Sequence, residues 1–149
     1  MITADTVFII TCSIAAVGWI IILLASPFWM GYDKFVIGIV IALLALSYSW
    51  LNFSNFDPGI LKKFSTLEGV GELFQNKYLL AAAWVHFLAF DLLAAVWIKN
   101  NSVKHGIGHL LIIPALFFTC MLGPLGFLIY LLTRFIKTKK YFAANFSWK

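Results

Sequence analysis

The chain has 149 residues, of which 62% are hydrophobic and 11% are charged, and its formal net charge is +5. Soluble domains usually carry about 25% charged residues, so this composition excludes an ordinary soluble protein and indicates an integral membrane protein. We expect a single membrane domain over residues 1–149, because no soluble domain fits beside the hydrophobic runs. Five of the eleven basic residues follow the last run, so we expect membrane lipids, and not nucleic acid, as the partner of the positive charge.

Four hydrophobic runs predict four transmembrane helices, at residues 6–25, 35–51, 78–98 and 110–132. Each run is close to the ~20 residues that a helix needs to cross a ~30 Å hydrocarbon core at a rise of 1.5 Å per residue. Two of the three connections between these runs are short. We therefore predict an all-α membrane protein, an antiparallel bundle of four transmembrane helices.

The long connection before the third run contains an amphipathic segment at residues 60–76. Its apolar residues recur at three- and four-residue steps, at Ile60, Phe64, Leu67, Val70 and Phe74. This spacing predicts a segment that lies on the membrane surface, with its apolar side toward lipid or the underside of the bundle. Ser65 and Glu68 form a capping-box pattern, which predicts a helix that begins at Ser65.

The basic residues predict the orientation in the membrane. With four spans, the N-terminus, the long connection and the basic, aromatic tail at residues 133–149 share one side, which carries eight basic residues against three on the other. Basic loops favour the cytoplasm, so we expect both termini there. The start, MITADT, lacks the positively charged region of a cleavable signal, and we expect a multi-pass protein of a bacterial inner membrane.

The third run carries two titratable side chains, Asp91 and His86, within 21 residues that have no other formal charge. An ionisable group inside a membrane span costs free energy unless it is neutral, paired or facing a polar cavity, so it indicates a functional site. The two positions lie about 140° apart around a helix, so they do not share one face. The alternative, that both side chains only form hydrogen bonds across the bundle, stays open.

The fourth run is interrupted near its middle by Gly123, Pro124 and Gly126. Pro124 cannot donate a hydrogen bond to the carbonyl of Cys120 and should kink the helix, while the glycines leave a groove. In an antiparallel pair of helices, this break lies at the depth of the two titratable residues of the third run. We therefore predict catalytic roles for Asp91 and His86, with a substrate-binding site at Trp84, Phe90, Cys120, Gly123, Pro124 and Gly126. The alternative is a kink that only improves packing.

A metal site is not expected. His105 and His109 are four residues apart, but no third or fourth ligand is nearby. Cys12 and Cys120 fall in hydrophobic runs and match no disulfide or metal pattern, so we interpret them as buried, inert thiols.

The sequence AAAWVHFLAFDLLAAVWI, the polar hairpin after it and the sequence LGPLGFLIYLL resemble the abscisic-acid-deficient-four-like membrane proteins. The resemblance rests on Trp84, His86, Asp91 and Leu92 in the third run and on Gly123, Pro124 and Gly126 in the fourth. Plant members of that family are needed to make the allenic carotenoid neoxanthin from violaxanthin. The resemblance therefore implies a role in carotenoid biosynthesis.

We accordingly expect an intramembrane isomerase-type enzyme, or a component of one, that acts on a carotenoid or another isoprenoid lipid. Opening an epoxide toward an allene needs one proton delivered to the epoxide oxygen and another removed from a neighbouring carbon. A carboxylic acid in apolar surroundings and an imidazole can divide those two steps. Such an isomerisation demands no metal or redox cofactor, and we expect none.

Two alternatives stay open. The first is a non-catalytic pigment- or lipid-binding protein that presents substrate to a partner biosynthetic enzyme. The second is a small proton-coupled transporter, for which one acidic residue and no inverted repeat give little support. The sequence leaves a homo-oligomer open as well.

Overall fold

The computed structural model describes residues 3–142, which form helices and no strands. The first segment is Ala4–Ile20 (α1) with its π-helical continuation Ile21–Ala25 (η1), and the second is Tyr32–Phe35 (α2), Val36–Ile41 (η2) and Ala42–Ser54 (α3). Two short helices, Ile60–Lys63 (α4) and Leu67–Leu73 (α5), precede the longest helix, Lys77–Lys104 (α6). The described chain ends with His109–Leu122 (α7) and Pro124–Thr138 (α8).

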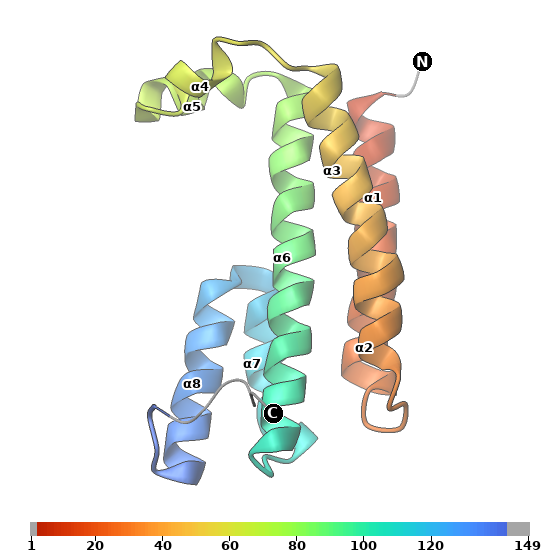
Figure 1. The fold of residues 1–149 in the computed structure, drawn as a ribbon, viewed down its shortest axis with the longest axis vertical. Helices are drawn as coiled ribbons and strands as arrows, with labels where there is room; N and C mark the ends of the chain where they lie inside the picture. The colour runs from red at the N-terminus through yellow and green to blue at the C-terminus, as the bar shows by residue number, and fades with distance from the viewer. Residues whose placement is uncertain (1–2, 143–149) are drawn as a thin grey trace, which may run out of the picture.

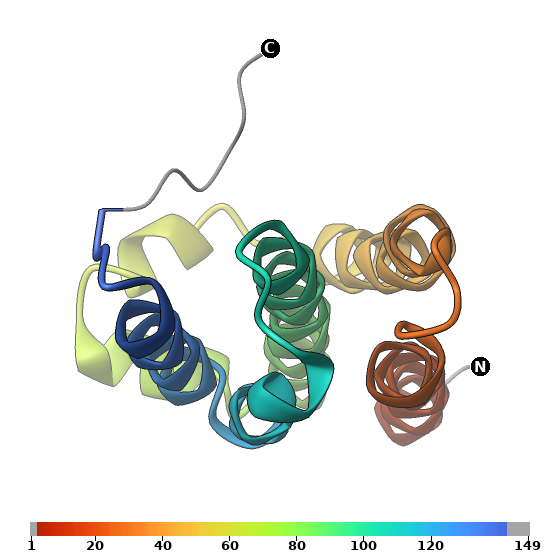
Figure 2. The same ribbon diagram turned by 90° about the horizontal axis from the view of Figure 1, so that it is seen from below.

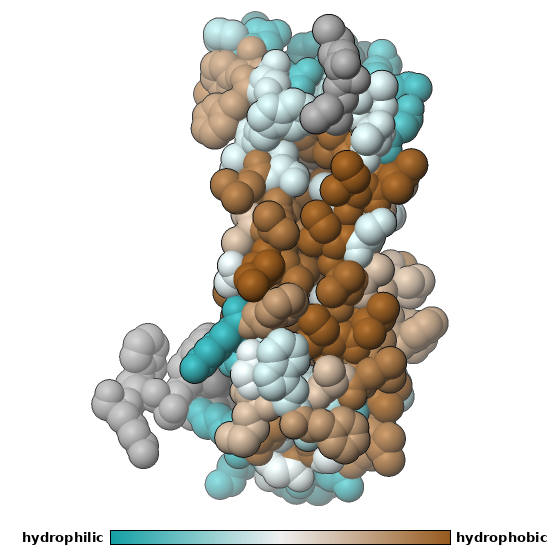
Figure 3. Space-filling view, turned by 90° about the vertical axis from the view of Figure 1, so that its right-hand side faces the viewer, coloured by the Kyte–Doolittle hydropathy of each residue, from teal (hydrophilic) through white to brown (hydrophobic). Residues whose placement is uncertain are grey.

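Among residues 3–142, three helical segments are long and apolar enough to cross a membrane: Ala4–Ala25, Tyr32–Ser54 and Lys77–Lys104. They coincide with the first three predicted spans, and each is a few residues longer. On the face formed by α1 and α3, a hydrophobic band separates hydrophilic residues at the two ends of the molecule (Figure 3). The protein is therefore an all-helical, multi-pass membrane protein.

The prediction of a continuous fourth span at residues 110–132 is wrong. α7 and α8 are separate helices of 14 and 15 residues that pack against each other and against the lower half of α6 (Figure 1). At 1.5 Å per residue each helix is only about 21–23 Å long, which is short of a ~30 Å hydrocarbon core. The chain enters the apolar region and returns to the same end, so the predicted four-helix bundle is replaced by three spans and a re-entrant helical hairpin.

The reversal depends on the residues that were expected to produce a kink. Gly123 has a φ of 28°, which favours glycine, and Pro124 is the first residue of α8, where its fixed φ and missing N–H suit a helix start. Gly126 is buried, and a Cβ there would overlap atoms of Thr119 and Ala115 in α7. Glycine at position 126 thus lets the two helices of the hairpin approach closely.

α6 is the centre of the fold. α1 and α3 pack on one side of it, and α7 and α8 pack on the other (Figure 2). Val85, Leu92 and Ile98 of α6 are fully buried in these contacts. Asp91 lies near the middle of this 28-residue helix, at the border between the half that the hairpin covers and the half that it does not.

A buried polar network joins the hairpin to the lower end of α6. The side-chain oxygen of Asn101 accepts hydrogen bonds from the Tyr130 hydroxyl at 2.7 Å and from the Arg134 guanidinium at 3.1 Å. All three residues are buried. Their pairing was not predicted, although Tyr130 and Arg134 are four residues apart and share one face of a helix.

A second polar contact ties α7 to the first span. Nε2 of His109 lies 2.9 Å from the carbonyl oxygen of Leu23, and because a carbonyl can only accept, the ring nitrogen donates. The residue four positions after Leu23 is Pro27, which has no N–H to offer that carbonyl. The His109 ring thus donates to the Leu23 carbonyl the hydrogen bond that the missing N–H of Pro27 cannot supply.

α4 and α5 form the predicted amphipathic segment. Its expected apolar side is confirmed for Ile60, Phe64 and Phe74, which line a cavity between this segment and the spans. Leu67 does not line this cavity, and 89% of its surface is exposed.

The capping-box prediction is wrong by one residue. α5 begins after Thr66, whose side-chain oxygen accepts a hydrogen bond from the N–H of Gly69 at 3.1 Å. Ser65 instead donates its hydroxyl proton to the carbonyl of Lys62 at 2.6 Å. The extended backbone of Thr66 makes it the better cap, because an N-cap residue has non-helical dihedral angles.

The orientation prediction also changes. Because the hairpin returns to the end where it starts, α1 begins and α8 ends at opposite ends of the molecule (Figure 1). The prediction that both termini share the cytoplasmic side is therefore wrong as far as the described chain extends. Of the predicted tail, residues 133–138 belong to α8, and residues 143–149 lie outside the described residues.

The new topology redistributes the basic residues. Among residues 3–142, three lie at the end where α6 begins: Lys62, Lys63 and Lys77. Seven lie toward the opposite end: Lys34, Lys99, Lys104, Arg134, Lys137, Lys139 and Lys140. The balance of basic residues therefore no longer supports the predicted orientation. The identity of the membrane stays a prediction.

Candidate functional site

The carboxylate of Asp91 lies at the tip of the re-entrant hairpin. A Cβ built on Gly123 would stand 2.5 Å from Asp91 Oδ1, so the missing side chain of this glycine makes room for the carboxylate. Gly123 is also the residue that caps the start of α8. The positive end of a helix dipole stabilises a nearby negative charge, which makes this a favourable place for a carboxylate in apolar surroundings.

Asp91 lines a cavity of about 360 Å³ between α6 and the hairpin. The cavity is lined by Trp84, Phe87, Leu88, Asp91, Cys120, Met121, Leu122, Gly123 and Pro124. Among residues 3–142, no hydrogen bond or ion pair reaches the Asp91 carboxylate. The site is therefore one carboxyl group, with a thiol beside it, in a cavity whose other side chains are apolar or aromatic.

The structure brings most of the predicted site residues together. Trp84, Cys120, Gly123 and Pro124 line the same cavity as Asp91, so the glycine-proline break lies beside Asp91. Gly126 is not part of that cavity and instead packs inside the hairpin.

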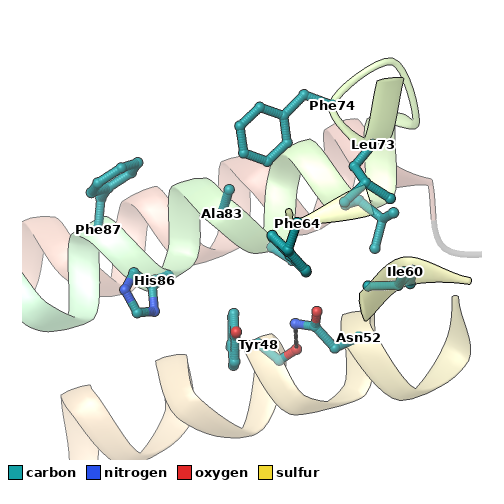
Figure 4. Close-up of a pocket in the computed structure, with 11 residues that line it drawn as sticks. Tyr48, Asn52, Ile60, Phe64, Leu73, Phe74, Ala83, His86 and Phe87 are labelled. Carbon is teal, nitrogen blue, oxygen red and sulfur yellow. Dashed lines mark hydrogen bonds between the residues drawn. The ribbon is translucent and has the colours of Figure 1, made fainter. Parts of the chain in front are cut away.

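His86 belongs to a different cavity. It lies with Tyr48, Asn52 and the α4–α5 segment on another side of α6 (Figure 4). Phe90 is 58% exposed, and the centre of its ring lies 4.6 Å from that of His86. Asp91 and His86 thus do not face one another within this chain, and Phe87 is the residue that borders both cavities.

Sequence reasoning missed Phe87, Tyr48 and Asn52 as cavity residues. Phe87 stands between the two titratable residues in sequence, which was a signal that could have been used. Tyr48 and Asn52 are four residues apart and share one face of α3, but only the packing of α3 on α6 brings them opposite His86. Within the described residues, no three side chains of His, Cys, Asp or Glu come close enough to hold a metal ion.

Comparison with known protein families places these residues in context. The sequence matches the ABA DEFICIENT 4-like family over residues 6–130. The chain belongs to this family. The match to the ABA DEFICIENT 4-like family includes Asp91, His86 and the whole Gly123–Gly126 turn, and it ends at Tyr130, before Arg134.

A curated relative from this family is Protein ABA DEFICIENT 4, chloroplastic, of Arabidopsis thaliana. The two sequences are 32% identical over 72 residues, which cover 44% of this chain and 33% of the relative. The aligned region thus spans about a third of the relative's length. No solved structure matches this chain.

Proposed function

We propose that this ABA DEFICIENT 4-like protein is an intramembrane isomerase-type enzyme, or a component of one, that acts on a carotenoid or another isoprenoid lipid. The observation that carries the proposal is the position of Asp91: a single carboxyl group at the middle of a membrane helix, against the tip of a re-entrant hairpin, in an otherwise apolar cavity. An ionisable group at this depth is costly to keep, so a chemical role is its best explanation.

The cavity suits an apolar substrate. Its aromatic and aliphatic side chains offer contacts to a hydrocarbon chain, and Asp91 offers the one carboxyl group. Its volume of about 360 Å³ is near the lower end of ligand pockets, so it holds the reacting part of a long isoprenoid and leaves the rest along the lipid-facing surface of α6.

Because His86 lies elsewhere, Asp91 carries both proton transfers in this proposal. For an epoxide that opens to an allenic alcohol, one carboxyl oxygen donates its proton to the epoxide oxygen while the C–O bond breaks. The other carboxyl oxygen accepts the proton that leaves the neighbouring carbon while the new C=C bond forms. The carboxylic acid is regenerated and the substrate keeps its composition, as an isomerisation requires.

A second candidate is a non-catalytic pigment-binding protein that presents substrate to a partner enzyme. It is favoured by the absence, among the described residues, of a second carboxylate or imidazole in the Asp91 cavity. A proton-coupled transporter receives less support, because the other carboxylates of α1 and α2, Asp5 and Asp33, lie at the ends of their spans.

Pigment conversion tests the proposal. Membranes that contain the protein as their only carotenoid-modifying component are supplied with the epoxide carotenoid violaxanthin, and the products are separated by chromatography. We expect Asp91→Asn to insert normally and to lower product formation by about 10²–10⁴-fold, the usual contribution of an acid–base group. Asp57→Asn makes the same chemical change in the exposed connection before α4 and should leave product formation unchanged.

Full product formation by a normally inserted Asp91→Asn protein contradicts the proposed chemistry. If the wild-type protein forms no product but retains pigment through purification, the pigment-binding alternative is correct instead.

A further inference from the structure

The His86 cavity is a second site, separate from the cavity of Asp91. It has a volume of about 250 Å³ and lies between α3, the α4–α5 segment and the first half of α6 (Figure 4). Most of its lining is apolar: Ile60, Phe64, Leu73, Phe74, Leu79, Ala82, Ala83 and Phe87. Its polar side chains are those of Tyr48, Asn52 and His86.

These three polar side chains are available to a ligand. The ring centres of Tyr48 and His86 are 5.7 Å apart, and neither side chain has a hydrogen-bond partner among residues 3–142. Asn52 donates its side-chain N–H to the backbone carbonyl of Tyr48 at 2.8 Å, which leaves its side-chain oxygen as an acceptor. One hydroxyl group placed among them can both donate and accept a hydrogen bond.

The three groups also lie at graded depths. Asn52 is two residues from the end of α3 and Tyr48 is six, which correspond to about 3 Å and 9 Å at 1.5 Å per residue. His86 is nine residues from the start of α6, or about 14 Å. Hydrogen-bonding groups thus run from the membrane surface into the apolar region along one side of the cavity.

The α4–α5 segment closes the cavity on the side of the water. Phe64 and Phe74 point into it, as Figure 4 shows, while Lys63 and Glu72 form an ion pair of 3.0 Å that joins the two short helices. On the lipid side, the hairpin covers only the lower half of α6, and Phe87 is 60% exposed. A ligand therefore reaches this cavity from the lipid.

We propose that this cavity binds the hydroxyl-bearing end of an elongated isoprenoid lipid through Tyr48, Asn52 and His86. The inference rests on the proposed function and adds its substrate class: hydroxylated isoprenoids are selected over hydrocarbons of the same skeleton. The volume of about 250 Å³ holds an end group and not a whole long-chain molecule. Because Phe87 borders both cavities, the hydrocarbon part of such a ligand extends past Phe87 toward Asp91.

Competitive retention tests the inference. The purified full chain in lipid nanodiscs is exposed to equal amounts of zeaxanthin, which has a hydroxyl group on each end ring, and β-carotene, which has the same skeleton without them. We expect the wild-type protein to retain zeaxanthin at least tenfold over β-carotene. Tyr48→Phe and His86→Phe should each reduce this ratio about five- to tenfold, because each removes one hydrogen-bonding group.

The controls separate this inference from the proposed chemistry. Tyr141→Phe makes the same change outside the cavity and should keep the wild-type ratio, and Asp91→Asn should keep it as well. Equal retention of the two carotenoids, retention of neither, or an unchanged ratio in both Tyr48→Phe and His86→Phe overturns the inference. If the Asp91→Asn protein is active and still prefers zeaxanthin, only the proposed chemistry is overturned. If the Asp91→Asn protein is inactive and has lost the zeaxanthin preference, only this inference is overturned.

Discussion

The two halves of α6 have different surroundings, although both are predominantly apolar. The lower half, from Asp91 to Lys104, is packed by α1, by η2 and by both arms of the hairpin, and it even buries polar residues such as Asn101 and Ser102. The upper half has no hairpin beside it, and its side chains Leu80, Trp84 and Phe87 remain largely exposed to the lipid side. Both cavities lie along this open half or at its lower border.

We infer from this difference that the two halves of α6 have different roles. Asn101 can be buried in the lower half because Tyr130 and Arg134 of the hairpin donate hydrogen bonds to it, and this network makes that half a rigid support. The upper half leaves one side of α6 uncovered at the depth where an apolar ligand is dissolved. Asp91 stands at the border, so the rigid half positions the carboxylate and the open half admits the ligand.

Among the changes that test this comparison of the two halves, Gly123→Ala should have the largest effect, because Gly123 contacts Asp91 where the two halves meet. The new Cβ would stand 2.5 Å from Asp91 Oδ1, and alanine would be strained at a φ of 28°. Displacing a reacting group by about 1 Å can cost ~10²-fold in rate, and we expect a loss of that order in pigment conversion. Gly38→Ala is the matched control, because a Cβ at Gly38 meets nothing within 4 Å. Equal activity of Gly123→Ala and Gly38→Ala would contradict the contact between the hairpin tip and Asp91.

Gly126→Ala should destabilise the lower half. Its Cβ would overlap backbone atoms of Thr119 and Ala115, so the arms of the hairpin must move apart. Overpacking of this kind costs about 1–3 kcal/mol. Thermal unfolding in detergent should show a lower Tm, again with Gly38→Ala as the control. An unchanged Tm would mean that α7 and α8 do not pack as closely as described.

Asn101→Ala and Asn100→Ala compare a buried with a more exposed polar contact at the same end of α6. Asn101 accepts hydrogen bonds from Tyr130 and Arg134 in the buried network, so its loss should cost about 1–3 kcal/mol. Asn100 is exposed and accepts a hydrogen bond from the Tyr32 hydroxyl at 2.6 Å, so its loss should cost only about 0.5–1.5 kcal/mol. Both costs are measurable by thermal unfolding. The reverse order would show that the buried network does not stabilise the hairpin.

The sequence predicts the upper half better than the lower half. Hydrophobic length suffices to place the three long apolar helical segments, and the apolar spacing of residues 60–76 suffices to place the short helices α4 and α5. The hairpin could not be distinguished from a fourth span, because residues 110–132 are as apolar as a span. The difference depends on the backbone of Gly123, and a glycine followed by a proline is compatible with a kink or with a reversal.

The candidate site could be predicted from the sequence only in part. Asp91 and the Gly123–Gly126 turn were expected at one depth, and both a kink and a reversal put the break there. The separation of His86 from Asp91 agrees with their angular offset of about 140° on a helix. The partners of His86 were not predictable, because Tyr48 lies on another helix and its pairing depends on how α3 packs against α6.

The re-entrant hairpin is the central claim of this account, and cysteine accessibility tests it most directly. In a variant with Cys12 and Cys120 replaced by alanine, single cysteines at positions 62, 104 and 139 are labelled with a membrane-impermeant thiol reagent, in sealed cells and in inverted vesicles. The re-entrant hairpin predicts that positions 104 and 139 react from the same side, and that position 62 reacts from the opposite side. Reaction of position 139 together with position 62, and opposite to position 104, would restore a continuous fourth span and contradict the hairpin.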